Sequence, residues 1–158
     1  MVINEMTEKE CRDILSRASF GRLGCALENQ PYVVPINFAY DGNDIVVLST
    51  SGQKIEWMRA NPKVCVQIDE IRSEKDWVSV IVNGQYQELP EPQYADEREH
   101  ARKLLQKRHL WWEAPMAERQ LRSADALVAP LFFRIQVHSM TGLRALPETS
   151  AVGSSRSL

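Results

Sequence analysis

The stretch Ser49-Thr50-Ser51-Gly52-Gln53-Lys54 decides how this sequence is interpreted, because it joins a strand pattern to a helix pattern. Ile45 to Leu48 predicts the strand and Ile55 to Ala60 predicts the helix. Hydroxyls and backbone N–H groups at a helix start donate hydrogen bonds, and Lys54 adds a positive charge in the first turn. The turn therefore suits a phosphate, although it lacks P-loop spacing and Ser/Gly clusters also mark plain connections.

Strand patterns precede this turn. Arg22 to Leu27, Tyr32 to Tyr40 and Asp44 to Leu48 alternate with the connections at 28–31 and 41–43, which is typical of hairpins. Pro35 lies inside the second pattern and cannot donate to a sheet ladder. It predicts a bulge, an edge strand, or a place where a ligand lies alongside; the backbone of Ile36 and Asn37 would then bond the polar rim of a flat ligand.

Further strands are predicted after the helix, which Asn61-Pro62 ends. The long second of these strands contains Gly84, where a bend or bulge would let the sheet curve. We expect the last strand to end at Met140-Thr141-Gly142. Six strands with one bulged member predict a mainly β barrel with flanking helices, and the three later strands are Val64 to Ile68, Trp77 to Leu89 and Leu131 to Val137.

Two more helices are expected. Thr7-Glu8-Lys9-Glu10 forms a capping box, and the helix that it starts should end near Ser19. Tyr94 to His109 is amphipathic and should pack on the barrel. Trp111 and Trp112 follow, either as an aromatic wall for a flat ligand or, as we favour, as a helix end that docks on the core.

The composition fits one soluble domain of 158 residues with a formal net charge of -2, which indicates neither nucleic acid nor a membrane as partner. No signal peptide or spanning segment is evident, so we expect the cytoplasm. Three cysteines without a C-x-x-C pair predict reduced thiols and no metal site. The domain should cover 1–146, and the small, polar tail 147–158 should be disordered.

Four motifs in this order resemble one family, the pyridoxamine 5'-phosphate oxidase-related flavoproteins of the FMN-binding split-barrel fold, especially the branch with the nitroimidazole-resistance proteins. The resemblance covers roughly residues 7 to 142, and the joint order is more specific than any single motif. The motifs are Phe20-Gly21-Arg22-Leu23-Gly24, Pro31 to Phe38, Gly52-Gln53-Lys54 with Asn61-Pro62, and Trp77-Val78-Ser79-Val80 with Gly84.

The resemblance implies a six-stranded split barrel and a homodimer with two FMN sites at the subunit interface. Carried over by position, one group of residues faces the flavin ring, a second holds the phosphate and a third lies at the cofactor rim. These groups are Pro35, Ile36 and Asn37; Ser49, Thr50, Ser51 and Lys54; and Trp77 and Ser79.

One residue departs from the family pattern. Ser49 stands where many members of the nitroimidazole-resistance branch resemble one another in having a histidine, which argues against carrying over their reductive activity and against a haem ligand. His100, His109 and His138 lie elsewhere and should be surface or packing residues.

No side chain is assigned a catalytic role, because the flavin would carry the chemistry. The leading hypothesis is an FMN-dependent oxidoreductase acting on a small molecule, with a reduced nicotinamide cofactor as a candidate electron donor. The alternatives are a flavin-binding protein without turnover, serving as a sensor, reservoir or interaction module, and a deazaflavin-dependent reductase on the same barrel.

Overall fold

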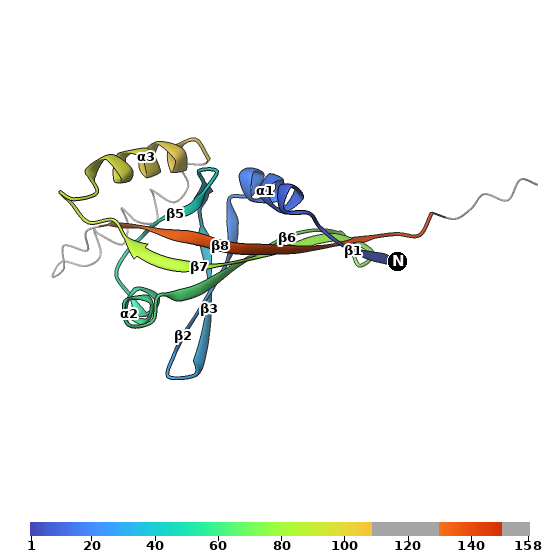
Figure 1. The fold of residues 1–158 in the computed structure, drawn as a ribbon, viewed down its shortest axis with the longest axis horizontal. Helices are drawn as coiled ribbons and strands as arrows, with labels where there is room; N and C mark the ends of the chain where they lie inside the picture. The colour runs from blue at the N-terminus through green and yellow to red at the C-terminus, as the bar shows by residue number, and fades with distance from the viewer. Residues whose placement is uncertain (109–129, 150–158) are drawn as a thin grey trace, which may run out of the picture.

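The computed structural model describes residues 1–108 and 130–149. Within these residues, antiparallel strands form one curled sheet on which three helices pack (Figure 1). The mainly β architecture with flanking helices is confirmed. The elements are β1 (Val2–Glu5), α1 (Glu8–Arg17), β2 (Phe20–Leu27), β3 (Gln30–Asn37), β4 (Ala39–Tyr40), β5 (Asp44–Ser49), α2 (Gln53–Ala60), β6 (Lys63–Ser73), β7 (Asp76–Glu88), α3 (Ala95–Gln106) and β8 (Leu131–Leu146).

The sheet follows the order β3-β2-β6-β7-β8-β5-β4, and β1 pairs with β8 beside this path. The long strand β8 joins the two ends of the molecule, because its first half pairs with β5 and its second half with β1. Strands β3 and β5 contact each other without pairing, so the sheet curls into a split barrel that hydrogen bonds do not close.

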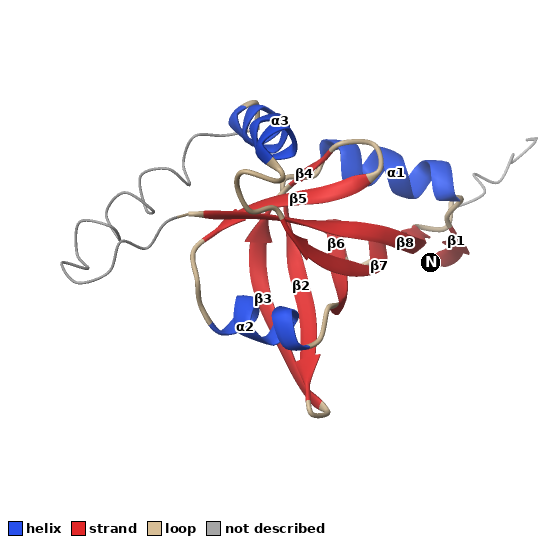
Figure 2. Ribbon diagram, turned by 60° about the vertical axis from the view of Figure 1, so that its left-hand side comes forward, coloured by secondary structure: helices blue, strands red, loops and turns tan. Residues whose placement is uncertain are grey.

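The helices lie on different sides of this sheet. In Figures 1 and 2, α1 and α3 lie above the long strands, whereas α2 lies below them beside the hairpin of β2 and β3. The capping box at α1 is confirmed, since the Glu10 N–H donates to the Thr7 hydroxyl and the Thr7 N–H donates to the Glu10 carboxylate. Helix α2 packs on β2, which places its first turn near the barrel.

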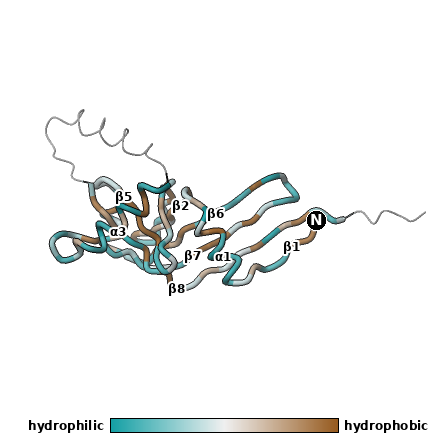
Figure 3. The backbone as a smooth tube through the Cα atoms, turned by 90° about the horizontal axis from the view of Figure 1, so that it is seen from above, coloured by the Kyte–Doolittle hydropathy of each residue, from teal (hydrophilic) through white to brown (hydrophobic). Residues whose placement is uncertain are grey.

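Alternation along the strands builds the core. Hydrophobic and hydrophilic residues follow one another along the chain in Figure 3, and on β7 the residues at 80, 82, 84 and 86 are buried while those at 81, 83 and 85 are exposed. The main cluster fills the barrel and includes Phe38 and Phe133. A smaller cluster lies under α3 and consists of Ala39, Val46, Leu89, Ala101, Leu105 and Phe132.

The expected count of six strands was wrong, since the described residues form eight. Strand β1 was missed because all four of its residues are exposed and show no alternation. The pattern from Tyr32 to Tyr40 is two strands, β3 and β4, because the Phe38 N–H leaves the ladder and donates to the Ser19 carbonyl at 3.1 Å. Strand β6 extends to Ser73, beyond the predicted end at Ile68.

The predicted end of the last strand at residues 140–142 was also wrong, because β8 continues to Leu146. Gly142 is needed within the strand for a close approach: a Cβ there would lie 2.8 Å from Cys11 Sγ and 2.9 Å from Met6 Sδ. The predicted irregularity at Gly84 is confirmed, because the register of β7 and β8 shifts between Asn83 and Gly84.

Pro35 lies in β3, which is the terminal strand of the sheet path, so the edge-strand interpretation holds for it. Trp111, Trp112 and His109 lie outside the described residues, as does the tail from residue 150. No described helix is long and apolar enough to cross a membrane. Cys11, Cys25 and Cys65 are free thiols, as the sequence predicted.

Candidate functional site

The hydroxyl-rich turn connects the end of β5 to the start of α2, as the sequence predicted. Ser49 and Thr50 are buried, Ser51 is exposed and Lys54 is half-buried. The Ser49 hydroxyl donates to the Thr50 carbonyl at 3.1 Å, so it is engaged by its own backbone. Of the predicted phosphate ligands, Ser51 and Lys54 are the two that are not buried.

The start of α2 is open. Gly52 is its N-cap, in extended backbone with φ 171°, and provides no side-chain cap. A Cβ built at Gly52 would meet no heavy atom within 4 Å. Uncapped N–H groups at a helix start attract anions, so the geometry leaves room for a phosphate at this end.

A shallow hollow of about 600 Å³ lies beside this turn. One wall is the Trp57 ring, whose centroid lies 5.4 Å from that of Tyr32 at an interplanar angle of 52°. The tilted pair fixes the orientation of the indole. The hollow is lined by Leu27, Gly52, Gln53, Glu56, Trp57 and Ala60.

A second group of predicted residues shares one face of the sheet. Directly paired residues project from the same face of an antiparallel sheet, and the register runs from Pro35 through Arg22 and Gln67 to Ile81. We call this surface the outer face. Its residues on β2, β3, β6, β7 and β8 include Phe20, Arg22, Val33, Pro35, Asn37, Gln67, Asp69, Ile71, Trp77, Ser79, Ile81, Thr141 and Leu143.

The predicted residues thus divide between two places. Pro35, Asn37, Trp77 and Ser79 lie on the outer face. Ile36 points the other way and is buried in the core, so its side chain does not face the same surface, although its backbone belongs to edge strand β3. The turn from Ser49 to Lys54 lies at the α2 end, and its hollow contains neither Trp77 nor Ser79.

The outer face carries several large exposed apolar side chains. Phe20, Val33, Ile71, Ile81 and Leu143 are between 43% and 70% exposed. Contiguous exposed apolar patches on soluble proteins mark interaction surfaces or ligand sites.

A polar network crosses the same face. The Arg22 guanidinium donates to the Asp69 carboxylate at 3.1 Å and to the Gln67 carbonyl at 3.3 Å. The Gln67 amide donates in turn to Asp69 at 3.0 Å and to the Ser79 hydroxyl at 3.1 Å. Sequence reasoning missed Arg22, Gln67 and Asp69 as candidate site residues, because only the strand register joins them to Ser79.

Ser79 also borders an apolar groove of about 370 Å³. Ile81 and Leu143 from the outer face line it, together with Met6 and Met140. The Ser79 and Thr141 hydroxyls are its uncharged polar groups, and Glu5 at one edge is its charged one.

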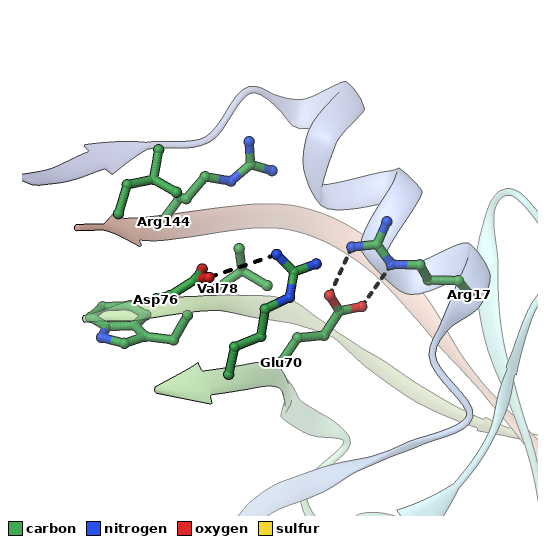
Figure 4. Close-up of a pocket in the computed structure, with 8 residues that line it drawn as sticks. Arg17, Glu70, Asp76, Val78 and Arg144 are labelled. Atoms are coloured by element: carbon green, nitrogen blue, oxygen red, sulfur yellow. Dashed lines mark hydrogen bonds and ion pairs between the residues drawn. The ribbon is translucent and has the colours of Figure 1, made fainter. Parts of the chain in front are cut away.

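Trp77 borders a different groove, of about 250 Å³, between α1 and the hairpin of β6 and β7. Figure 4 shows Arg17 facing Glu70, with Arg144 above them on β8. Arg17 donates to Glu70 at 2.6 and 2.8 Å, and this pairing holds the pKa of the Glu70 carboxyl below its usual range.

The other two arginines of this groove also face carboxylates, Arg144 facing Glu10 at 3.3 Å and Arg72 facing Asp76 at 3.8 Å. Each arginine of the groove therefore faces a carboxylate, two of which, Glu70 and Asp76, line the groove themselves.

Two further features bear on the chemistry. His100 lies on α3 and His138 lines a separate groove with Arg12 and Tyr40, so neither contributes to the turn or the outer face. The Tyr86 hydroxyl is buried and has no hydrogen-bond partner among the described residues. Burial raises the pKa of Tyr86, which therefore stays neutral in the physiological range.

Comparison with known proteins gives concordant matches. The family model described as pyridoxamine 5'-phosphate oxidase matches residues 7–144. An uncharacterized protein of Rhizobium meliloti (strain 1021) is 41% identical over 146 residues, which cover 92% of this chain and 97% of that protein.

Two solved structures extend the comparison. The crystal structure of a FAD-binding protein from Mesorhizobium loti is 38% identical, with a TM-score of 0.76 over 93% of this chain and 99% of that one. The second structure, from Bacteroides thetaiotaomicron, is described as a 5-nitroimidazole antibiotic resistance protein. It shares the fold at 20% identity, with a TM-score of 0.64 over 91% of this chain and 89% of that one.

Proposed function

The chain belongs to the pyridoxamine 5'-phosphate oxidase family, and from that premise we propose that it binds a flavin nucleotide between two copies of itself and acts as a small-molecule oxidoreductase. The observation that carries the proposal is the division of the expected ligands. The turn expected to accept the phosphate lies between β5 and α2, and residues expected to face the flavin lie elsewhere, on an exposed face of the sheet. A second copy of the chain would bring the turn of one copy next to the outer face of the other.

The residues present fit the groups of a flavin. A phosphate dianion needs hydroxyl and N–H donors with a cation, and Ser51, Lys54 and the open start of α2 offer this set. The isoalloxazine needs polar contacts along its rim and apolar or aromatic contact on its faces. The outer face offers Arg22, Gln67 and Trp77 for these purposes. The related FAD-binding protein of Mesorhizobium loti supports a flavin as the ligand.

The chain would bind and orient the flavin, exclude water from it and leave the redox step to the cofactor, which supplies hydride or single-electron transfer when bound. No side chain is proposed as a catalytic acid, base or nucleophile. A reduced nicotinamide is the proposed electron donor, a small molecule the proposed acceptor, and the cytoplasm the proposed location.

The dimer is tested by placing a charge on the outer face. Ile81→Glu should convert a dimer into a monomer and weaken flavin binding, because the carboxylate would be buried against the second copy without a partner. Leu146→Glu is the matched control. Leu146 has the same 43% exposure as Ile81, but it pairs with Val2 and does not belong to the outer face. Mass by light scattering and flavin titration give the two readouts.

The proposal predicts that Leu146→Glu remains a flavin-saturated dimer while Ile81→Glu does not. A wild-type monomer that saturates with flavin, or an Ile81→Glu variant that behaves like the control, would contradict the shared site.

A further inference from the structure

We propose that Gln67 is a positioning residue, which fixes the Ser79 hydroxyl as a hydrogen-bond donor toward a neutral acceptor on the rim of the flavin. This inference rests on the flavin site proposed above and assigns a role to the polar network of the outer face. In that network Arg22 and Asp69 hold Gln67, and Gln67 in turn determines where the proton of Ser79 can go.

The neighbours of the Gln67 amide allow it one orientation. Its Oε1 accepts from the Arg22 guanidinium at 3.3 Å, and its Nε2 donates to the Asp69 carboxylate at 3.0 Å. Turning the amide over would set its NH2 group against a guanidinium, which has only donors, and its oxygen against a carboxylate, which has only acceptors. The ion pair between Arg22 and Asp69, at 3.1 Å, holds both neighbours in place. The second Nε2 proton of Gln67 is therefore directed to Ser79.

The fixed amide determines the role of the Ser79 hydroxyl. Gln67 Nε2 donates to Ser79 Oγ at 3.1 Å, so this bond occupies a lone pair of the hydroxyl and leaves its proton unused. Within residues 1–108 and 130–149, the Ser79 side chain forms this hydrogen bond and no other. Ser79 is half-buried and lines the apolar groove of the outer face. The hydroxyl therefore has a proton to donate to a ligand in that groove.

The surroundings of Ser79 identify the kind of acceptor that it suits. Ile81 and Leu143 line the groove beside it, and a hydrogen bond among apolar side chains is stronger than one in water. The ion pair behind Gln67 has no net charge, and Glu5 at the edge of the groove repels an anion. The groove therefore suits a carbonyl oxygen or a ring nitrogen better than a carboxylate or a phosphate. The rim of an isoalloxazine carries both of these neutral acceptors.

The test exchanges the Gln67 amide for a carboxylate of the same shape. Gln67→Glu leaves only acceptors beside Ser79, so the hydroxyl should donate to the new carboxylate and be lost to the flavin. In titrations with FMN and with FAD, Ser79→Ala and Gln67→Glu should each weaken flavin binding by roughly 2- to 12-fold, the effect of one hydrogen bond. Each should also lower the midpoint potential of the bound flavin, because reduction places more electron density on the acceptors of its rim.

Asn83→Asp is the matched control for the added charge. Asn83 is exposed, pairs with Cys65 on the outer face and undergoes the same exchange of amide for carboxylate. In a Ser79→Ala background, Gln67→Glu should change affinity and potential no more than Asn83→Asp does, because the hydroxyl through which Gln67 acts is gone. The effect of Asn83→Asp should be the same with and without that hydroxyl.

The melting temperature of each flavin-free variant shows whether the sheet is intact. If Gln67→Glu does not fold, Gln67→Met takes its place in the same cycle, since it removes both polar groups of the amide without adding a charge.

Effects of Gln67→Glu and Ser79→Ala that simply add, in affinity and in potential, would overturn the positioning role and leave the flavin site standing. A Ser79→Ala variant with the affinity and potential of wild type would do the same. Binding of neither flavin by the wild type would overturn both proposals.

Discussion

Replacing Ser51 and Lys54 of the proposed phosphate turn together, Ser51→Ala with Lys54→Ala, should greatly weaken flavin binding while leaving the fold intact. Ser51 is exposed and contributes to neither core cluster. Lys54 is the second residue of α2, and the helix is held by other side chains, Ile55 and Met58, both fully buried. The variant therefore removes a hydroxyl donor and a cation from the turn without opening a cavity.

The structure indicates how much flavin-binding free energy this double variant should lose. The Ser49 hydroxyl already donates to the Thr50 carbonyl and Thr50 is buried, so two of the four predicted side chains, Ser51 and Lys54, are counted. A charge-assisted hydrogen bond contributes about 1.5 to 3 kcal/mol, and partial exposure to solvent reduces the sum of two such bonds below its full value of about 3 to 6 kcal/mol. The loss should be about 2 to 5 kcal/mol, or roughly 30- to 5,000-fold in Kd.

The assay is a flavin titration at fixed ionic strength, with the melting temperature of the flavin-free protein measured in parallel. Lys9→Ala is the matched control, because Lys9 is an exposed lysine at the second residue of α1. It removes the same charge from the same position of a different helix. Affinity should not change in this control.

Unchanged flavin affinity in the double variant, with the control also unchanged, would refute the assignment of the turn to a phosphate. A loss of affinity accompanied by an equal loss in the control would show that net charge rather than the turn is responsible.

Three further predictions concern the fold. Gly84→Ala should lower the free energy of unfolding by about 3 kcal/mol in denaturant titration, because its Cβ would lie 2.3 Å from the Gln136 carbonyl oxygen; stability like wild type would contradict the close packing at the bulge. Tyr86→Phe should leave stability equal or raise it by up to about 1 kcal/mol, because it removes a buried hydroxyl without a partner among the described residues; a clear loss would reveal a hidden partner. Glu70→Gln should cost less than about 1 kcal/mol at neutral pH, since the pair with Arg17 is partly exposed. Arg17 lowers the pKa of Glu70, so this contribution is fully present above the ordinary glutamate pKa of about 4.3 and is lost as pH falls from there through the lowered pKa of Glu70; a difference that persists in stronger acid would contradict the pairing.

The sequence predicted the elements that depend on contacts between residues close together in the chain. The capping box at Thr7 needs contacts within four residues, and it formed as expected. The hairpin between β2 and β3 also follows from local chemistry, because Glu28 and Asn29 take up positive φ in a two-residue connection.

The features that the sequence did not predict depend on contacts between residues far apart in the chain. Gly142 resembles a strand end, yet it lies inside β8 because Met6 and Cys11, more than a hundred residues earlier, pack against it. All four residues of β1 are exposed, so no alternation marks it as a strand, and within residues 1–108 and 130–149 its pairing partner is β8. Such partners are not visible in a local pattern.

The candidate site also has a part that could be predicted from neighbouring residues and a part that depends on long-range packing. The turn from Ser49 to Lys54 is continuous in sequence and could be singled out from its hydroxyls and its lysine. Arg22, Gln67 and Asp69 carry ordinary polar side chains whose link to Ser79 depends on the register of three strands. The hollow at Trp57 likewise depends on how α2 packs against β2.

The central claim is that this chain is a flavoprotein, and the most direct test is the visible absorption spectrum of protein purified without added cofactor. Mass identification of the molecule released by heat completes the measurement. We expect a yellow dimer that releases a flavin. A colourless protein that also fails to take up added FMN or FAD would contradict it.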